Sequence, residues 1–139
     1  MSRAPALVPE LAVRDLAASL RFWCGLCGFA VLYDRPEEGF VCLEGEGGAR
    51  VMLDQLGLGR DWVTGPLERP LGRGINLEFA VTALATRLAA LDRAAWPLFL
   101  GPEEKTYRVG AAEVTVRQFL VQDPDGYLLR FSERLPDGG

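Results

Sequence analysis

The Asp-Pro-Asp-Gly tetrapeptide at residues 123–126 restricts how this chain can fold more than any other feature. It separates an apolar-rich run over 114–122 from a run over 127–133 whose side chains alternate in character. Its proline presets φ for a turn, its first aspartate is able to hydrogen-bond the following backbone, and its glycine adopts a conformation that other residues resist. We therefore predict a β-hairpin here, with the rest of the chain building the other walls around it.

The first half of the chain has the pattern of a strand, a helix and three further strands. Pro9 removes a ladder hydrogen bond from the first strand, which favours an edge position. Asp15 is a good N-cap, and apolar residues follow it at helical spacing until Gly28 ends the helix. The expected elements are a strand over 6–13, a helix over 16–27, and strands over 29–34, 39–44 and 50–55.

The second half repeats this pattern after a connection over 56–74 that is rich in glycine and proline. A shift of 68 residues places Val13 on Val81 and Leu20 on Leu88. The expected elements are a strand over 75–81, a helix over 82–95, and strands over 98–103, 114–122 and 127–133. We expect the segments 56–74 and 101–112 to form the loops that shape the cavity.

These elements predict an α+β fold made of two tandem βαβββ modules. We expect a single domain over 1–139, with a first module over 6–55, the connection over 56–74 and a second module over 75–133. Each module offers a curved sheet with its helix on the outside. Pairing the two would give a curved mixed sheet around a cleft.

Composition excludes several classes of function. The net charge is −4 and there is no run of lysine or arginine, which disfavours a nucleic-acid partner. The chain contains no histidine, so the usual triad base, the commonest metal ligand and the usual near-neutral proton shuttle are missing. Because it shows neither an apolar run of membrane-spanning length nor the apolar core of a signal peptide, we expect a cytoplasmic protein with no membrane partner.

Alternation along the strands predicts which side chains face the cavity. The residues expected on that side are Glu10, Met52, Asp54, Asn76, Glu78, Arg130 and Ser132. Three carboxylates and one guanidinium would not be accepted there unpaired. Two interpretations stay open: the set binds a ligand, or Arg130 is ion-paired across the groove and the set is structural. A hard-cation site built from the three carboxylates is disfavoured because Arg130 would oppose the cation.

Three aromatic residues are candidate walls of a ligand groove: Phe40, Trp62 and Tyr107. Planar ligands bind well between such rings, particularly when they are cationic. For each ring the alternative is packing in the core or at an interface. Phe22 and Trp23 lie on the amphipathic first helix, so we expect both of them in the core.

Two motifs connect the chain to a known family. The first covers 11–23, Leu-Ala-Val-Arg-Asp-Leu-Ala-Ala-Ser-Leu-Arg-Phe-Trp, with the helix exit Leu-Cys-Gly-Phe at 26–29. The second covers 122–131, Gln-Asp-Pro-Asp-Gly-Tyr-Leu-Leu-Arg-Phe. With the repeat, they make the chain resemble the glyoxalase, bleomycin-resistance and extradiol-dioxygenase group, the vicinal oxygen chelate superfamily. The resemblance implies the two-module fold, but this superfamily hosts several chemistries, so function must be argued from the site.

Enzymes of this family hold a divalent metal with His, Gln or Glu side chains on the first and last strands of each module. By resemblance, those four positions fall at about Val8, Met52, Asn76 and Arg130. Valine has no donor atom, methionine is too soft for the hard cations involved, asparagine is a weak ligand and arginine brings a positive charge. We therefore expect no metal and no cofactor.

The resemblance is nearest to the bleomycin-resistance proteins, which sequester a drug instead of transforming it. It implies a homodimer with ligand grooves between subunits, often with exchange of the N-terminal strand around a proline such as Pro9. An alternative is a metal-independent lyase or isomerase with Glu78 as general base and Arg130 holding an anionic intermediate. The expected ligand-binding residues are Phe40, Met52, Asp54, Trp62, Asn76, Glu78, Tyr107 and Arg130.

Overall fold

The computed structural model describes residues 4–136 and contains the predicted pattern twice. The first module consists of β1 (Glu10–Val13), α1 (Leu16–Trp23), β2 (Ala30–Arg35), β3 (Phe40–Glu44) and β4 (Arg50–Gln55). Its four strands form one sheet in the order β1-β4-β3-β2. β1 pairs in parallel with β4, and the other neighbours are antiparallel.

The second module repeats this topology with β5 (Asn76–Ala80), α2 (Leu84–Arg93), β6 (Leu100–Val109), β7 (Ala112–Gln122) and β8 (Leu128–Arg134). Its sheet has the order β5-β8-β7-β6, again with only the first and last strands parallel. The α+β fold with two βαβββ modules is confirmed. Each module contributes one four-stranded mixed sheet, as predicted.

Several strands differ in length from the prediction, and β1 and β6 differ most. β1 begins at Glu10 instead of residue 6, directly after Pro9, and it is an edge strand of its sheet. Proline has no N–H to donate, so it is tolerated at the start of an edge strand, and its carbonyl still accepts a hydrogen bond from the Met52 N–H at 2.9 Å.

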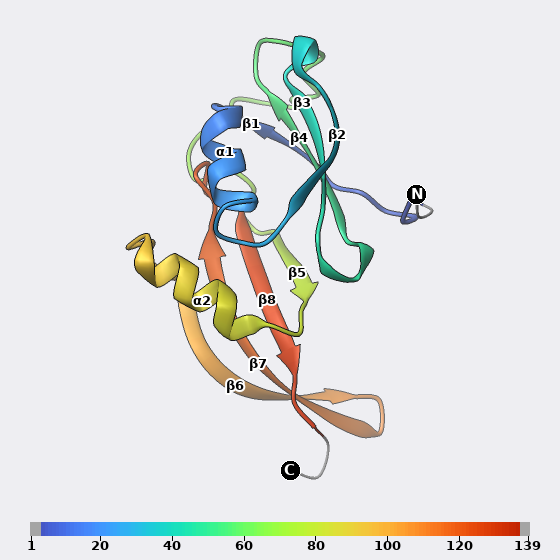
Figure 1. Cartoon of the computed structure of the whole chain (residues 1–139). Helices are drawn as coiled ribbons and strands as arrows, with labels where there is room; N and C mark the ends of the chain where they lie inside the picture. The colour runs from blue at the N-terminus through green and yellow to red at the C-terminus, as the bar shows by residue number, and fades with distance from the viewer. Residues whose placement is uncertain (1–3, 137–139) are drawn as a thin grey trace.

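The segment 101–112, expected to be a loop, instead belongs mostly to a long hairpin of β6 and β7. β8 pairs with β7 only from Val116 onward, so the end of this hairpin is a two-stranded arm that projects beyond the sheet (Figure 1). Every residue of β6 is exposed, and the strand therefore lacks the apolar alternation from which its length would be predicted.

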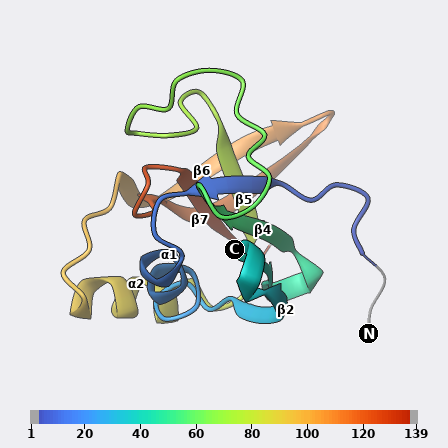
Figure 2. The same ribbon diagram turned by 90° about the horizontal axis from the view of Figure 1, so that it is seen from above.

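Both helices cover the same side of the two sheets, and the connection between the modules lies on the other side (Figures 1 and 2). A single core lies beneath them: Phe79 of β5 packs edge-to-face against Trp23 of α1 at 6.1 Å and against Phe29 at 5.1 Å between ring centroids. Phe22 and Trp23 are fully buried, as predicted. Neither helix in the described range 4–136 is long and apolar enough to cross a membrane.

The Asp-Pro-Asp-Gly turn is held by its own first carboxylate. Oδ1 of Asp123 accepts hydrogen bonds from the backbone N–H groups of Asp125 and Tyr127, both at 2.9 Å, and Gly126 adopts a φ of 98°. Oδ2 accepts a hydrogen bond from Nε1 of Trp23 at 3.2 Å. The turn predicted from the sequence therefore also joins the second module to the helix of the first.

Two further contacts of the turn reach the first module. Oδ1 of Asp125 accepts a hydrogen bond from the Arg14 N–H at 3.2 Å, and the Tyr127 hydroxyl donates to the Ala12 carbonyl at 2.8 Å. The Ala12 carbonyl and the Arg14 N–H both lie at the end of β1, just before α1 begins. The turn thus fixes where the first strand and the first helix meet.

Arg87 joins the modules at the other end of the core. Its side chain is buried, with Nε donating to the Cys27 carbonyl at 3.0 Å and an Nη2 atom 3.6 Å from Oε1 of Glu46. Oε2 of the same glutamate accepts a hydrogen bond from the Thr82 N–H at 2.7 Å. A buried guanidinium is stable here because its charge is paired and its N–H groups are satisfied.

Stability should depend on pH through Asp123. Burial raises its pKa from 3.8 to about 6, against the lowering effect of the hydrogen bonds from Tyr127 and Trp23. The folded chain then binds a proton more tightly than the unfolded chain, so this group's contribution to the unfolding free energy falls as pH rises from about 4 to about 6. Urea unfolding at four pH values should show this fall in the wild type and not in Asp123→Asn.

Asp123→Asn should also be less stable at every pH by about 1–3 kcal/mol, because its amide cannot accept both the backbone and the indole N–H groups in the same way. The gap between the two proteins should narrow as pH rises from 4 to 6. Parallel pH profiles would show that Asp123 does not titrate in that range.

A second stability prediction concerns the end of α2. Ala95 has a φ of 53°, a left-handed conformation in which a Cβ is unfavourable. Ala95→Gly should therefore raise the unfolding free energy by about 0.5–1 kcal/mol. The neighbouring Ala94 has a φ of −83°, so Ala94→Gly is the matched control and should lower stability. Urea midpoints that move the same way in both variants would contradict this explanation.

Candidate functional site

An acidic pocket lies on the face of the first sheet that is turned away from the helices. It is a cavity of about 330 Å³ lined by Glu10, Ala12, Asp54, Arg60, Asp61 and Trp62. Glu10 and Asp54 come from the paired strands β1 and β4, in which Glu10 lies opposite Met52 and Ala12 opposite Asp54. The other three charged or aromatic side chains come from the connection. We call this cavity the acidic pocket.

The two strand carboxylates of the acidic pocket interact directly. The pKa of Asp54 is raised to about 7, by burial first and then by a hydrogen bond with Glu10 and the negative charge of that residue. With a pKa of about 7, the Asp54 carboxyl group is partly protonated near neutral pH. Arg35 lowers the Asp54 pKa and Asp61 raises it.

The wall contributed by the connection is aromatic. The indole of Trp62 is 73% exposed, and the guanidinium carbon of Arg60 lies over its ring, 4.8 Å from the centroid. Asp61 shapes this segment because its Oδ2 accepts a hydrogen bond from the Gly57 N–H at 3.1 Å. Gly57 has a φ of 87°, a conformation that suits glycine. An exposed indole beside carboxylates is suited to binding a cation.

Phe40 and Met52, two of the predicted ligand-binding residues, belong to the sheet beneath this pocket. The Phe40 ring is only 3% exposed, because the Arg35 guanidinium lies over it at 3.9 Å and the Tyr33 ring is 5.8 Å away. Phe40 is therefore part of the packed floor and not an open wall. Met52 is half-buried beside Glu10.

Arg130, Asn76 and Glu78 form a second group, on the second sheet. Nε of Arg130 donates to Oδ1 of Asn76 at 3.2 Å, and Nη2 donates to Oε1 of Glu78 at 3.3 Å. The other carboxylate oxygen of Glu78 accepts a hydrogen bond from the Ser132 hydroxyl at 3.0 Å. These contacts follow from the register, which places Glu78 opposite Arg130. The guanidinium is therefore paired between the adjacent strands β5 and β8, and not across a groove.

Tyr107 lies in neither group. Its hydroxyl accepts a hydrogen bond from Nε2 of Gln118 at 2.7 Å, and the same amide nitrogen donates to Oε1 of Glu103 at 3.1 Å. Gln118 is buried and was not predicted as a site residue. Tyr107 is placed on the projecting arm because β6 is longer than its sequence pattern indicates.

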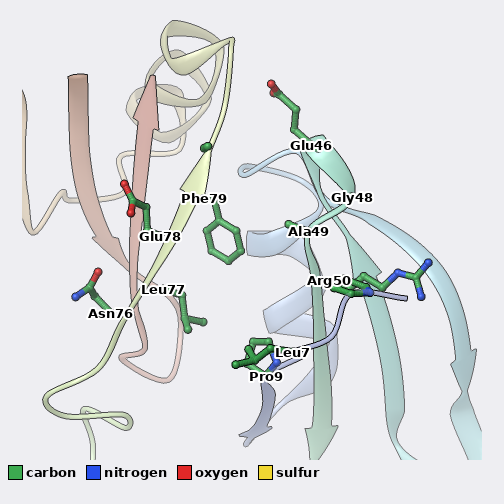
Figure 3. Close-up of a pocket in the computed structure, with 13 residues that line it drawn as sticks. Leu7, Pro9, Glu46, Gly48, Ala49, Arg50, Asn76, Leu77, Glu78 and Phe79 are labelled. Atoms are coloured by element: carbon green, nitrogen blue, oxygen red, sulfur yellow. The ribbon is translucent and has the colours of Figure 1, made fainter. Parts of the chain in front are cut away.

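A larger groove separates the free edge of β5 from the first module (Figure 3). Its volume is about 490 Å³, and its lining includes Leu7, Pro9, Ala49, Leu77 and Phe79. In Figure 3, Leu77 and Phe79 point into the space between the modules, whereas Asn76 and Glu78 point to the opposite side of the strand. The groove is mainly apolar, although the charged or polar residues Glu46, Arg50, Asn76 and Glu78 also line it.

Among residues 4–136, no group of three or more His, Cys, Asp or Glu side chains is arranged to hold a metal ion. The three carboxylates considered from the sequence do not converge, because Glu78 pairs with Arg130 in the second module while Glu10 and Asp54 meet in the first. The residues that sequence reasoning missed are Arg60 and Asp61, which lie in the connection, where no periodic pattern predicts side-chain direction.

No family model matches the sequence, and a search of curated proteins finds no significant match. Solved structures do match its fold. TioX from Micromonospora sp. ML1 aligns with a TM-score of 0.69 and 20% identity, over 95% of this chain and 100% of that one. A glyoxalase/dioxygenase from Nostoc punctiforme aligns with a TM-score of 0.68 and 18% identity, over 93% of this chain and 90% of that one.

A glyoxalase/bleomycin resistance protein/dioxygenase from Alicyclobacillus acidocaldarius aligns with a TM-score of 0.61 and 14% identity, over 96% of this chain and 93% of that one. These likenesses span nearly the whole of each chain and both βαβββ modules, as the two sequence motifs predict. The chain therefore has the fold of the glyoxalase/bleomycin resistance protein/dioxygenase superfamily, the vicinal oxygen chelate superfamily.

Proposed function

We propose that the chain is a metal-free binding protein of the bleomycin-resistance type, which acts in the cytoplasm by sequestering a cationic, aromatic antibiotic. The acidic pocket is the observation that carries this proposal. It combines the carboxylates of Glu10 and Asp54 with the exposed indole of Trp62 in one cavity. Carboxylates attract the ligand's positive charge, and the indole face binds its cationic or planar part.

Sequestration is favoured over turnover because the groups needed for catalysis are already engaged. Both carboxylate oxygens of Glu78 accept hydrogen bonds, one from Arg130 and one from Ser132. A general base needs a free oxygen within reach of the substrate proton. A lyase or isomerase that uses Glu78 as base and Arg130 as anion holder would first have to break this network, which makes it the weaker proposal.

A homodimer is part of the same proposal. A two-stranded ribbon is marginally stable by itself, and the β6–β7 arm leaves Tyr107 and Val109 exposed, so a second chain packed against the arm would bury apolar surface. β1 pairs with β4 of its own chain in a four-residue register. We also propose exchange of the N-terminal strand, in which β1 of the partner chain would pair with β4 in the same register.

Metal-free bleomycin should bind and change the fluorescence of Trp62. At pH 8, where the Asp54 carboxyl group is mostly ionised, Asp54→Asn removes one pocket charge and should weaken binding about tenfold, the effect of losing roughly 1.4 kcal/mol. Asp92→Asn on the exposed side of α2 is the control with the same change in net charge, and it should bind as the wild type does. Calorimetry measures the affinities. No heat and no fluorescence change at micromolar drug would rule out the proposed ligand.

The affinity should also depend on pH with a defined sign. Because the Asp54 pKa is about 7, the Asp54 carboxyl group loses its proton as pH rises through 7 and then attracts a cation more strongly. Binding of a permanently cationic ligand should therefore be tighter at pH 8 than at pH 6, with proton release on binding near pH 7. Asp54→Asn should bind equally at both values, and an equal pH dependence in the variant would assign the titration to another group.

A further inference from the structure

We propose that Arg60 is an internal competitor for the acidic pocket: its guanidinium occupies the indole face of Trp62 that a ligand's planar cation must take. This inference rests on the proposed function, because it names the ligand group that the same pocket recognises. The expected group is flat and delocalised, a guanidinium or an amidinium.

The contacts of Arg60 identify it as a loosely held occupant. Its guanidinium carbon lies 4.8 Å from the centroid of the Trp62 ring, and the residue lines the same cavity as the carboxylates of Glu10, Asp54 and Asp61. Within residues 4–136 it makes neither an ion pair nor a side-chain hydrogen bond, unlike Arg87 and Arg130. The cation–π contact with Trp62 is therefore what positions this guanidinium within the described part of the chain, and a ligand can displace it without breaking a salt bridge.

Among residues 4–136, the carboxylates of the pocket also have no cationic partner at ion-pair distance. Glu10 and Asp54 line the same cavity, and Asp61 accepts a hydrogen bond from the backbone N–H of Gly57. The other nearby cation is Arg35 of β2, which stacks over Phe40 and pairs with Glu38 at 3.0 Å. The charge of the pocket is therefore available to a ligand, and the aromatic face is the part that is already taken.

The chemical class of the ligand group follows from the occupant. A guanidinium stacks flat on an indole because its charge is spread over a planar group that is weakly hydrated, whereas an ammonium is a compact and strongly hydrated charge. The indole face of Trp62 that accepts the Arg60 guanidinium should therefore also accept an amidinium of similar shape. Because stacking at exposed sites is weak, the competition should alter affinity by a small factor, about threefold.

Benzamidine is the probe for this inference, with neutral benzamide as its isosteric control. Arg60→Gln should bind benzamidine about threefold more tightly than the wild type, as measured by calorimetry and Trp62 fluorescence. Arg93→Gln removes the same charge from the exposed end of α2 and should leave the affinity unchanged. Benzamide should bind neither protein. Equal affinities in Arg60→Gln and Arg93→Gln, or no detectable benzamidine binding to either protein, would overturn the inference.

Arg60→Lys separates stacking from the general field of the charge. It keeps the positive charge but loses the planar group, so it should bind benzamidine more tightly than the wild type and less tightly than Arg60→Gln. Affinity equal to that of the wild type would assign the whole effect to charge and overturn the inference. Trp62→Leu in the Arg60→Gln background should abolish the gain, and a retained gain would place the competition elsewhere.

Bleomycin titration keeps this inference distinguishable from the proposed function. If the wild type does not bind bleomycin but Arg60→Gln gains affinity for benzamidine, the antibiotic assignment fails and the inference about Arg60 stands. If bleomycin binds the wild type at the pocket but Arg60→Gln and Arg60→Lys both behave as the wild type toward benzamidine, the inference fails alone.

Discussion

The buried carboxylate of Asp123 is the interaction on which the arrangement of the two modules depends. It holds the hairpin turn through two backbone N–H groups and reaches the indole of Trp23 in the other module. Arg87 of α2 makes the equivalent connection at the far end, because it contacts Cys27 and Glu46 of the first module. With both ends fixed, the helices share one core, and the opposite sheet faces remain free to form sites.

The sheet registers decide which of these free faces is suited to bind a cation. In the second module, Glu78 lies opposite Arg130, and the two charges neutralise each other. In the first module, Asp54 lies opposite Ala12 and diagonal to Glu10, so two carboxylates meet with no cation of the described part of the chain at ion-pair distance. The same alternation of polar side chains thus produces a satisfied ion pair in one sheet and an unneutralised acidic surface in the other.

Much of the fold follows from local signals in the sequence. Three signals that each act over a few residues predict both modules: the N-cap Asp15, the apolar periodicity of the helices and the turn at 123–126. The length of β6 did not follow, because an exposed ribbon has no apolar alternation. Alternation placed Asp54 beside Glu10, but the burial of Phe40 depends on Arg35 of a neighbouring strand, and the positions of Arg60 and Asp61 depend on loop geometry.

The central claim is that the ligand's cation lies between Trp62 and the carboxylates of Glu10 and Asp54. A crystal structure of the chain with metal-free bleomycin tests it most directly. The account predicts a cationic group of the drug against the indole face and within ion-pair distance of one of those carboxylates, with the Arg60 guanidinium moved away. Drug bound in the apolar groove beside β5, with Arg60 still stacked on Trp62, would contradict it.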